Sequence, residues 1–255
     1  MPAIPFESNV ACCSPGGPLK VNIIFREISV TKTRHDKPKH HRLSFPARFI
    51  SFEGIDGCGK STLMDQLANG LATAGIPRIR TREPGGTTIG EKIREILLDP
   101  ASSEMSSRAE VLLYSASRAQ LTEQVIVSAM KKGSWVLTDR FVDATFAYQG
   151  FGRGFDLEQL RIIQEWTTKD LWPDKTILLD CDVDAAMSRL GIRNGADRDR
   201  IESEDRIFHQ KVRNGYLALA KKEQERFLIL DASKPLEEVI AEFYERFWLT
   251  EVAGR

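Results

Sequence analysis

The chain has 255 residues, enough to bury the core of one α/β domain, and we therefore predict a single main domain. Lysine plus arginine number 36 and aspartate plus glutamate number 36, which leaves no overall positive field to draw the chain onto nucleic acid or an anionic membrane. No apolar run approaches the ~18 residues that span a bilayer, and the start lacks a secretory signal pattern. The four cysteines form no CxxC pair, which favours a reducing, cytoplasmic setting.

Residues 1–47 differ in composition from the rest of the chain. Three of the four histidines lie there, with PGGP at 15–18 and the basic run KTRHDKPKHHR at 32–42. We expect a poorly ordered extension, and an organelle-targeting or regulatory arm and a Cys/His metal site stay open as alternatives. The main domain is expected at residues 48–250.

From Phe49 onward, short apolar runs alternate with longer segments of helical period. The predicted strands are FISFE at 49–53, the run after Pro77, WVLTD at 135–139, TILLD at 176–180 and FLILD at 227–231. Strands separated by helices indicate a parallel sheet covered on both faces. Functional groups should gather at the carboxyl ends of these strands, which carry the acids Glu53, Asp139, Asp180 and Asp231.

The segment GIDGCGKS, at 54–61, follows the first predicted strand and matches the phosphate-cradling pattern GxxxxGKS/T. Its glycines let backbone N–H groups turn towards phosphate oxygens, beside the positive end of the following helix. Lys60 is expected to reach the β- and γ-phosphates of ATP, and the Ser61 hydroxyl to bind Mg²⁺. We predict a three-layer α/β fold of the P-loop type with a five-stranded parallel sheet. The predicted nucleotide-binding residues are Gly54, Ile55, Asp56, Gly57, Cys58, Gly59, Lys60, Ser61 and Thr62.

Two further acids are candidates near the metal. Asp56 would hold a metal-bound water or a substrate's sugar, and the alternative is a solvated loop acid. Asp139 ends a strand, as a magnesium-binding acid would, and we prefer it to Asp180 because Arg140 adjoins it. The predicted metal ligands are therefore Ser61 and Asp139.

The other motifs favour transfer of phosphate to a small acceptor over a switch or a motor. A switch GTPase needs NKxD or TKxD, and TTKDL at 167–171 fails that pattern because its Lys and Asp are adjacent. TREPGGT at 81–87 carries Arg82 out of a strand through a rigid turn. In the helical segment 112–121, Tyr114 and Arg118 lie four residues apart and could grip a flat base, although such a pair is more often an ordinary helix surface. The glycines at 150, 152 and 154 predict a mobile loop.

With these motifs in order, the chain resembles the thymidylate kinases of the nucleoside monophosphate kinase group. The motifs are EGIDGCGKST, TREPGGT, EVLLYSASRAQL, DRFVDATFAYQGFGRG and DRIESED, and they cover Phe49 to about residue 248. The resemblance implies transfer of the γ-phosphoryl group of MgATP to dTMP by a homodimer. It also implies substrate-binding roles for Arg82, Tyr114, Arg118, Arg140, Thr145, Tyr148 and Gln149: Tyr114 stacks on thymine, Arg118 contacts the base edge, Arg82 and Arg140 surround the acceptor phosphate, and the others line the nucleoside.

The family differs in where a catalytic arginine originates. Gly57 stands where some members carry a basic residue, so the resemblance implies a lid arginine, as in the bacterial type. The lid is expected at about 188–205, and closing it would exclude water. We favour Arg193, then Arg198, which makes the predicted catalytic set Lys60, Asp56, Arg140, Arg193 and Arg198. The alternative for this segment is a solvated loop of mixed charge.

Two rival functions stay open at this point. One is a kinase for another nucleoside monophosphate or a deoxynucleoside, because the thymine methyl group is worth only about 1–3 kcal/mol in a pocket. The other is a P-loop protein that binds nucleotide without transferring phosphate, against which Lys60, Ser61, Asp139 and Arg140 argue together. Tyr114 also departs from the phenylalanine common in the family, and its hydroxyl needs a partner if buried.

Overall fold

The structure is a computed structural model that describes residues 48–194 and 198–252, the side chains of 192–194 excepted. The expected N-terminal extension, residues 1–47, lies outside the described residues, as do the alternatives weighed for it. Within the described ranges no helix is long and apolar enough to cross a membrane.

A five-stranded parallel sheet forms the middle layer and confirms the predicted fold class. Its order is β2-β3-β1-β4-β5. The bounds of the strands are β1 Phe49–Glu53, β2 Arg78–Arg82, β3 Trp135–Asp139, β4 Lys175–Asp180 and β5 Phe227–Asp231. Asp139 pairs in register with Phe52 of β1 and Arg82 of β2, so the carboxyl ends of these three strands meet at one edge.

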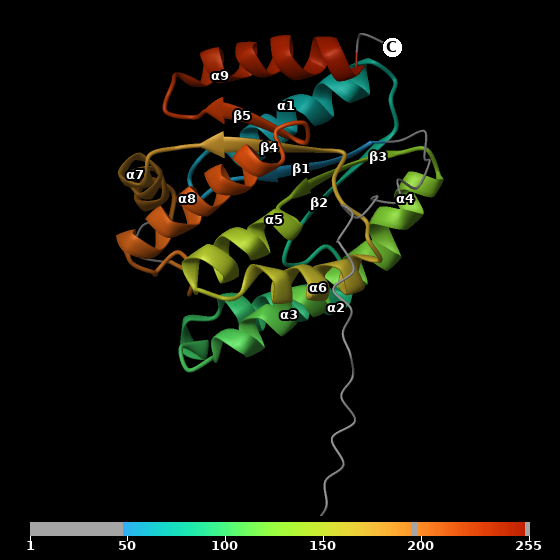
Figure 1. Cartoon of the computed structure of the whole chain (residues 1–255). Coiled ribbons are helices and arrows are strands. Elements are labelled where there is room, and N and C mark those ends of the chain that lie inside the picture. The colour runs from blue at the N-terminus through green and yellow to red at the C-terminus, as the bar shows by residue number, and fades with distance from the viewer. Residues whose placement is uncertain (1–47, 195–197, 253–255) are drawn as a thin grey trace, which may run out of the picture. The chain divides into compact units, whose positions relative to one another are not determined.

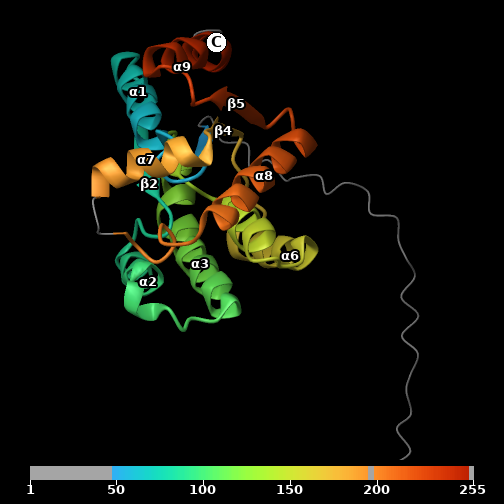
Figure 2. The same cartoon turned by 90° about the vertical axis from the view of Figure 1, so that its left-hand side faces the viewer.

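Helices cover both faces of this sheet (Figure 1). On one face lie α1 (Lys60–Thr73), α9 (Leu236–Phe243) and its π-helical continuation η4 (Tyr244–Val252). The opposite face carries α3 (Ser107–Leu121), α5 (Val142–Thr145), α6 (Leu157–Thr168) and α8 (Arg206–Lys222), with α2 (Thr88–Leu98) against α3. Helix α7 (Val183–Asn194) lies near the carboxyl ends of β4 and β5, as Figure 2 also shows. The remaining helical turns are η1 (Pro100–Ser102), η2 (Thr122–Ile126), α4 (Val127–Lys131) and η3 (Phe146–Gly152).

The sequence specifies where several of these helices begin. Thr87, Ser106, Asp156 and Asp205 each precede a helix, and each side chain accepts a hydrogen bond from a backbone N–H in the first turn. Such caps satisfy N–H groups that have no partner within the helix, and each typically contributes about 1 kcal/mol.

The prediction of a mobile loop around the glycines at 150–154 is wrong in part. Phe146–Gly152 instead continue α5 as the π-helical segment η3. A β-carbon on Gly150 would lie 2.5 Å from a Leu157 methyl group, and one on Gly152 would lie 2.7 Å from the Phe208 ring. These two glycines therefore allow close helix packing, which sequence alone does not distinguish from turn formation.

Candidate functional site

The phosphate loop joins β1 to α1 through backbone conformations that favour glycine. Gly54, Gly57 and Gly59 have φ values of 135°, 84° and 100°. A β-carbon on Gly57 would also collide with the backbone carbonyl of Ala186 in α7. The fold of this chain therefore leaves no room at position 57 for the basic side chain that some members of the family carry there.

Lys60, the first residue of α1, directs its ammonium group into the loop. The side chain is buried, and Nζ donates to the carbonyl oxygens of Gly54 at 3.2 Å and Ile55 at 3.1 Å. Nζ also lies 3.9 Å from a carboxylate oxygen of Asp56. A positive charge inside a ring of backbone groups at a helix N-terminus is the arrangement that binds phosphate.

A cavity of about 470 Å³ opens beside this loop, within the size range of sites for small molecules. Most of the residues predicted from the sequence line it, namely Asp56, Gly57, Gly59, Lys60, Ser61, Thr62, Arg82, Tyr114, Arg118, Asp139, Arg140, Thr145, Tyr148 and Gln149. Gly54, Ile55 and Cys58 belong to the loop but not to the cavity wall. Residues predicted for the nucleotide side and for the acceptor side, far apart in the sequence, thus share one cavity.

Arg140 connects the two sides of this cavity. Its Nη2 lies 3.0 Å from the Asp56 carboxylate and donates to the Tyr148 hydroxyl at 2.7 Å and the Gly54 carbonyl at 3.3 Å. The residue has a φ of 72°, unusual for a side chain of this size, and its backbone N–H donates to the carbonyl of Phe52 at 3.0 Å. Burial favours a raised pKa for the Asp56 carboxyl, but Arg140 and Lys60 outweigh burial and hold that pKa well below its usual range.

The two acids that competed for the metal differ in their partners. Asp139 lines the cavity, and its Oδ1 is buried without a hydrogen-bond partner among the described residues. Asp180 instead forms a two-pronged ion pair with Arg213, at 2.6 and 2.9 Å. A buried carboxylate oxygen without a partner suits a cation, and Ser61 opens onto the same cavity. No cluster of three or more acidic, histidine or cysteine ligands occurs in the described part of the chain, so a metal here would need phosphate oxygens or water as further ligands.

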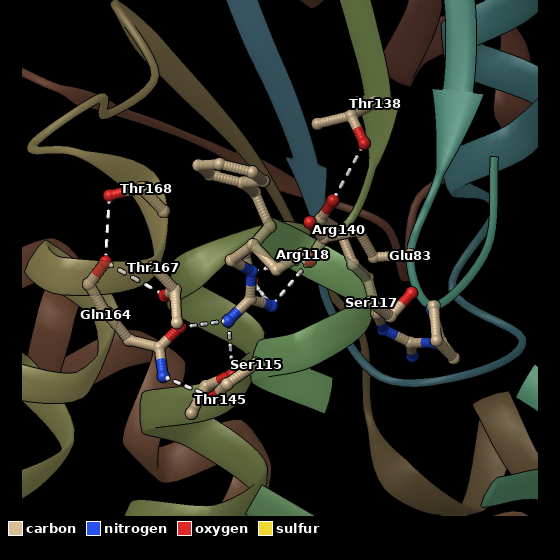
Figure 3. A network of polar contacts seen from close by, with 12 residues as sticks. Glu83, Ser115, Ser117, Arg118, Thr138, Arg140, Thr145, Gln164, Thr167 and Thr168 are labelled. Carbon is tan, nitrogen blue, oxygen red and sulfur yellow. Dashed lines mark hydrogen bonds and ion pairs between the residues drawn. The ribbon is translucent and has the colours of Figure 1, made fainter. Parts of the chain in front are cut away.

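Arg118 is a buried residue of the cavity wall. Its guanidinium group donates to Glu83 at 2.7 Å, to Thr145 at 2.7 Å, to the Phe141 carbonyl at 2.9 Å and to Gln164. Figure 3 shows Arg118 at the centre of this network. The predicted contact between Arg118 and a base stays a prediction, and it would require a donor to be shared with these partners.

The structure adds cavity residues that the motifs did not single out. Glu83 is buried beside Arg118, and its Oε1 has no hydrogen-bond partner among the described residues. Arg94 of α2 donates to the Pro84 carbonyl at 3.0 Å and lines the same wall. Glu83 lies inside the TREPGGT motif, whereas no motif in the sequence marks Arg94. The others are Pro84, Leu98, Ala144, Arg189, Asp199, Ile201 and Glu202.

The expected lid segment carries four arginines, Arg189, Arg193, Arg198 and Arg200. Arg200 donates to the Leu97 carbonyl at 2.9 Å and pairs with Glu110. Arg193 lies in α7, and its side chain is outside the described residues. Arg198 is exposed and does not line the cavity. Arg189 does line it, and its Nη1 donates to the Ala232 carbonyl at 3.1 Å. The choice among them stays a prediction.

A phosphate loop on a parallel sheet of this order, with an acceptor cavity beside it, defines a nucleotide-dependent kinase of the P-loop class. The family model described as thymidylate kinase matches residues 52–243 of the chain. The thymidylate kinase of Geotalea daltonii is 50% identical over 195 residues, which cover 74% of this chain and 91% of the relative. That of Caldanaerobacter subterraneus is 47% identical, covering 76% and 90%, and that of Fervidobacterium nodosum 46% identical, covering 78% and 98%. The chain belongs to the thymidylate kinase family.

Proposed function

We propose that the chain transfers the γ-phosphoryl group of MgATP to dTMP in the cavity beside the phosphate loop. The observation that carries this proposal is the link from Lys60 and Asp56 through Arg140 to Tyr148, which joins a phosphate site to an acceptor site. The family supports the same conclusion, since the enzyme is a kinase that acts with ATP on dTMP. A protein that only bound nucleotide would have no need of the acceptor wall.

Residues of the chain supply most of what phosphoryl transfer requires. Lys60 and the N-terminus of α1 hold the phosphates of ATP, and Arg140 neutralises charge on the acceptor phosphate. Ser61 and Asp139 would hold Mg²⁺, whose charge offsets that of the β- and γ-phosphates. An arginine of α7 or of the segment after it completes the charge around the moving group. Arg193 and then Arg198 are the candidates that the sequence favours, and Arg189 joins them because it lines the cavity.

An assay of ADP formation with a series of monophosphates tests the proposal. We expect dTMP to be the preferred acceptor over dCMP, UMP and AMP, and we expect EDTA to abolish turnover and added Mg²⁺ to restore it. Activity with CMP or UMP and none with dTMP would overturn the proposal.

Replacing Tyr114 tests base stacking. Tyr114 stands on the cavity wall, and a base stacked on an aromatic ring gains about 1–3 kcal/mol. We expect Tyr114→Ala to raise KM for dTMP about 10-fold or more with little change in KM for ATP, whereas Tyr114→Phe keeps the ring and stays near the wild type. Equal effects of both variants would contradict stacking.

We also propose that the chain forms a homodimer through the exposed faces of α3 and α6. These helices pack side by side and present Leu112, Ile162 and Trp166, whose exposed fractions are 61%, 67% and 81%. Large apolar side chains gathered on neighbouring helices are typical of a surface that another subunit covers, and tryptophan is a frequent anchor in such interfaces. A second copy of the chain is the occupant that the resemblance to thymidylate kinases favours.

Light scattering on the purified chain tests this interface. We expect the wild type to have the mass of a dimer and Trp166→Lys to have that of a monomer, because a lysine at the centre of an apolar interface loses its hydration. Leu249→Lys is the matched control, since Leu249 is 58% exposed but belongs to η4 on the opposite face of the sheet. A monomeric wild type, or a dimeric Trp166→Lys, would contradict the interface.

A further inference from the structure

Glu110 is a buried carboxylate that the mechanism above does not use. It lies in the first turn of α3, is 1% exposed, and accepts hydrogen bonds from side chains of two other segments. Its Oε1 accepts from Gln149 Nε2 at 2.9 Å and from Arg153 Nε at 3.2 Å. Its Oε2 accepts from Arg153 Nη2 at 3.1 Å and lies 2.7 Å from Arg200 Nη1.

This carboxylate determines which end of the Gln149 amide faces the cavity. Burial favours a raised pKa for the Glu110 carboxyl, but hydrogen bonds from Arg153, Gln149 and Arg200 outweigh burial and hold that pKa below its usual range. An ionised carboxylate only accepts hydrogen bonds, so Gln149 has to direct its NH₂ group towards it. No described residue donates a hydrogen bond to the side-chain oxygen Oε1 of Gln149, and Gln149 lines the cavity. The wall therefore offers an acceptor there.

We propose that Glu110 is a positioning residue that makes the acceptor site select bases carrying a proton on N3. The inference rests on the proposed function. Thymine carries an N3–H, which the oxygen of Gln149 accepts. In cytosine, N3 carries a lone pair instead, and two acceptors facing each other in a buried site are unfavourable. Glu110 thus acts on the base through Gln149 without touching it.

Glu110→Gln is expected to reverse the orientation of the Gln149 amide. Two guanidinium donors, Arg153 Nη2 and Arg200 Nη1, face the position of Oε2, whereas one, Arg153 Nε, faces Oε1. The oxygen of the new amide therefore stays at the Oε2 position, where it accepts two hydrogen bonds, and Arg153 Nε loses its acceptor. The NH₂ group of the new amide then takes the position of Oε1 and faces Gln149. Gln149 turns over to accept from it and presents its own NH₂ group to the cavity. The wall changes from an acceptor to a donor, which suits N3 of cytosine.

Steady-state kinetics with dTMP and dCMP test the inference in three variants. For Glu110→Gln we expect the ratio of kcat/KM for dTMP to that for dCMP to fall about 10- to 100-fold, mainly through the KM values. Glu110→Asp keeps an acceptor-only group, so it keeps the wild-type ratio even if both rates fall. Glu204→Gln keeps the ratio as well, because Glu204 pairs with the same Arg153, at 2.6 Å, but has no contact with Gln149.

The outcomes separate this inference from the proposed function. A wild type that prefers dTMP, together with an unchanged ratio in Glu110→Gln, would overturn the role of Glu110 alone. Equal losses on dTMP and dCMP in Glu110→Gln would indicate a merely structural residue and would overturn it too. A wild type that phosphorylates dCMP at least as well as dTMP would overturn both the proposed function and this inference.

Discussion

Arg140→Ala is expected to lower the rate of phosphoryl transfer about 10²- to 10³-fold, the usual effect of removing one preorganised group that stabilises developing charge. Arg140 contacts both Asp56 of the phosphate loop and Tyr148 of the opposite wall, which are also joined directly by a hydrogen bond of 3.4 Å from the Tyr148 hydroxyl to Asp56. Without Arg140, the partly buried Asp56 carboxylate keeps Lys60, with a smaller contribution from His209, as its positive neighbours, and we expect the pKa of Asp56 to rise. Single-turnover measurements with saturating ATP and dTMP report the transfer step directly.

Arg80→Ala is the matched control for this variant. Arg80 belongs to β2 and pairs with Asp65 at the surface, where an ion pair contributes at most about 1 kcal/mol. Arg80→Ala should therefore leave the rate of phosphoryl transfer unchanged. If Arg140→Ala bound ATP normally and transferred phosphate at the wild-type rate, the role assigned to Arg140 would be wrong.

The second large effect concerns Glu53, the last residue of β1, directly before the phosphate loop. The side chain is fully buried, and its Oε1 accepts from the Ser51 hydroxyl at 2.6 Å and the Phe141 N–H at 2.7 Å. The other carboxyl oxygen, Oε2, forms a hydrogen bond of 2.8 Å with the Tyr216 hydroxyl. Burial, together with the nearby charge of Asp143, raises the pKa of Glu53 to about 8. The folded protein thus carries a neutral carboxylic acid at neutral pH.

This pKa makes the stability of the fold depend on pH. Between the ordinary value of 4.5 and the folded value of about 8, the folded state holds a proton that the unfolded state has lost. The free energy of unfolding should therefore decrease as the pH rises through this window, by at most about 1.4 kcal/mol per pH unit from this group. Above about pH 8 the contribution of Glu53 levels off.

Urea unfolding of wild type and Glu53→Gln at pH 6, 7 and 8 isolates this effect. The amide mimics the neutral acid, since its oxygen can accept from Ser51 and Phe141 while its NH₂ group donates to Tyr216. We expect the wild type to lose stability relative to Glu53→Gln as the pH rises. Other titrating groups cancel in this difference, so parallel pH profiles of the two proteins would contradict a raised pKa.

Much of the fold could be predicted because its signals are local. Apolar runs mark four of the five strands, the exception being β2 with the sequence RIRTR. TILLD is largely buried, as an apolar run predicts, whereas FLILD lies at the edge of the sheet and leaves Ile229 38% exposed. The segment 146–152 could not be predicted in the same way. Its glycines owe their presence to Leu157 and Phe208, which approach only once α6 and α8 have packed.

The residues of the candidate site also include some that local sequence signals predict and some that only packing brings to the cavity. Lys60 and Ser61 follow from an unbroken motif, whereas Glu83, Arg94 and Arg189 join the cavity through packing of elements distant in the sequence. Asp139 as a metal ligand stays a prediction, for which the arginine next to it in the sequence is one reason. The fold adds a second reason, because Arg213 of α8 forms an ion pair with Asp180, whereas Asp139 faces the cavity.

The sequence by itself determined the fold class and the kinase family, and it predicts a triphosphate site at residues 54–62, because glycine spacing and motif order are properties of the chain alone. Only the tertiary structure decided which charges meet. Gly57 faces the Ala186 carbonyl, so cationic charge cannot come from the loop at that position. Glu110 reaches Gln149, Arg153 and Arg200 because α3 packs against η3 and the segment after α7. Contacts of this kind depend on distances between side chains that no spacing along the chain encodes.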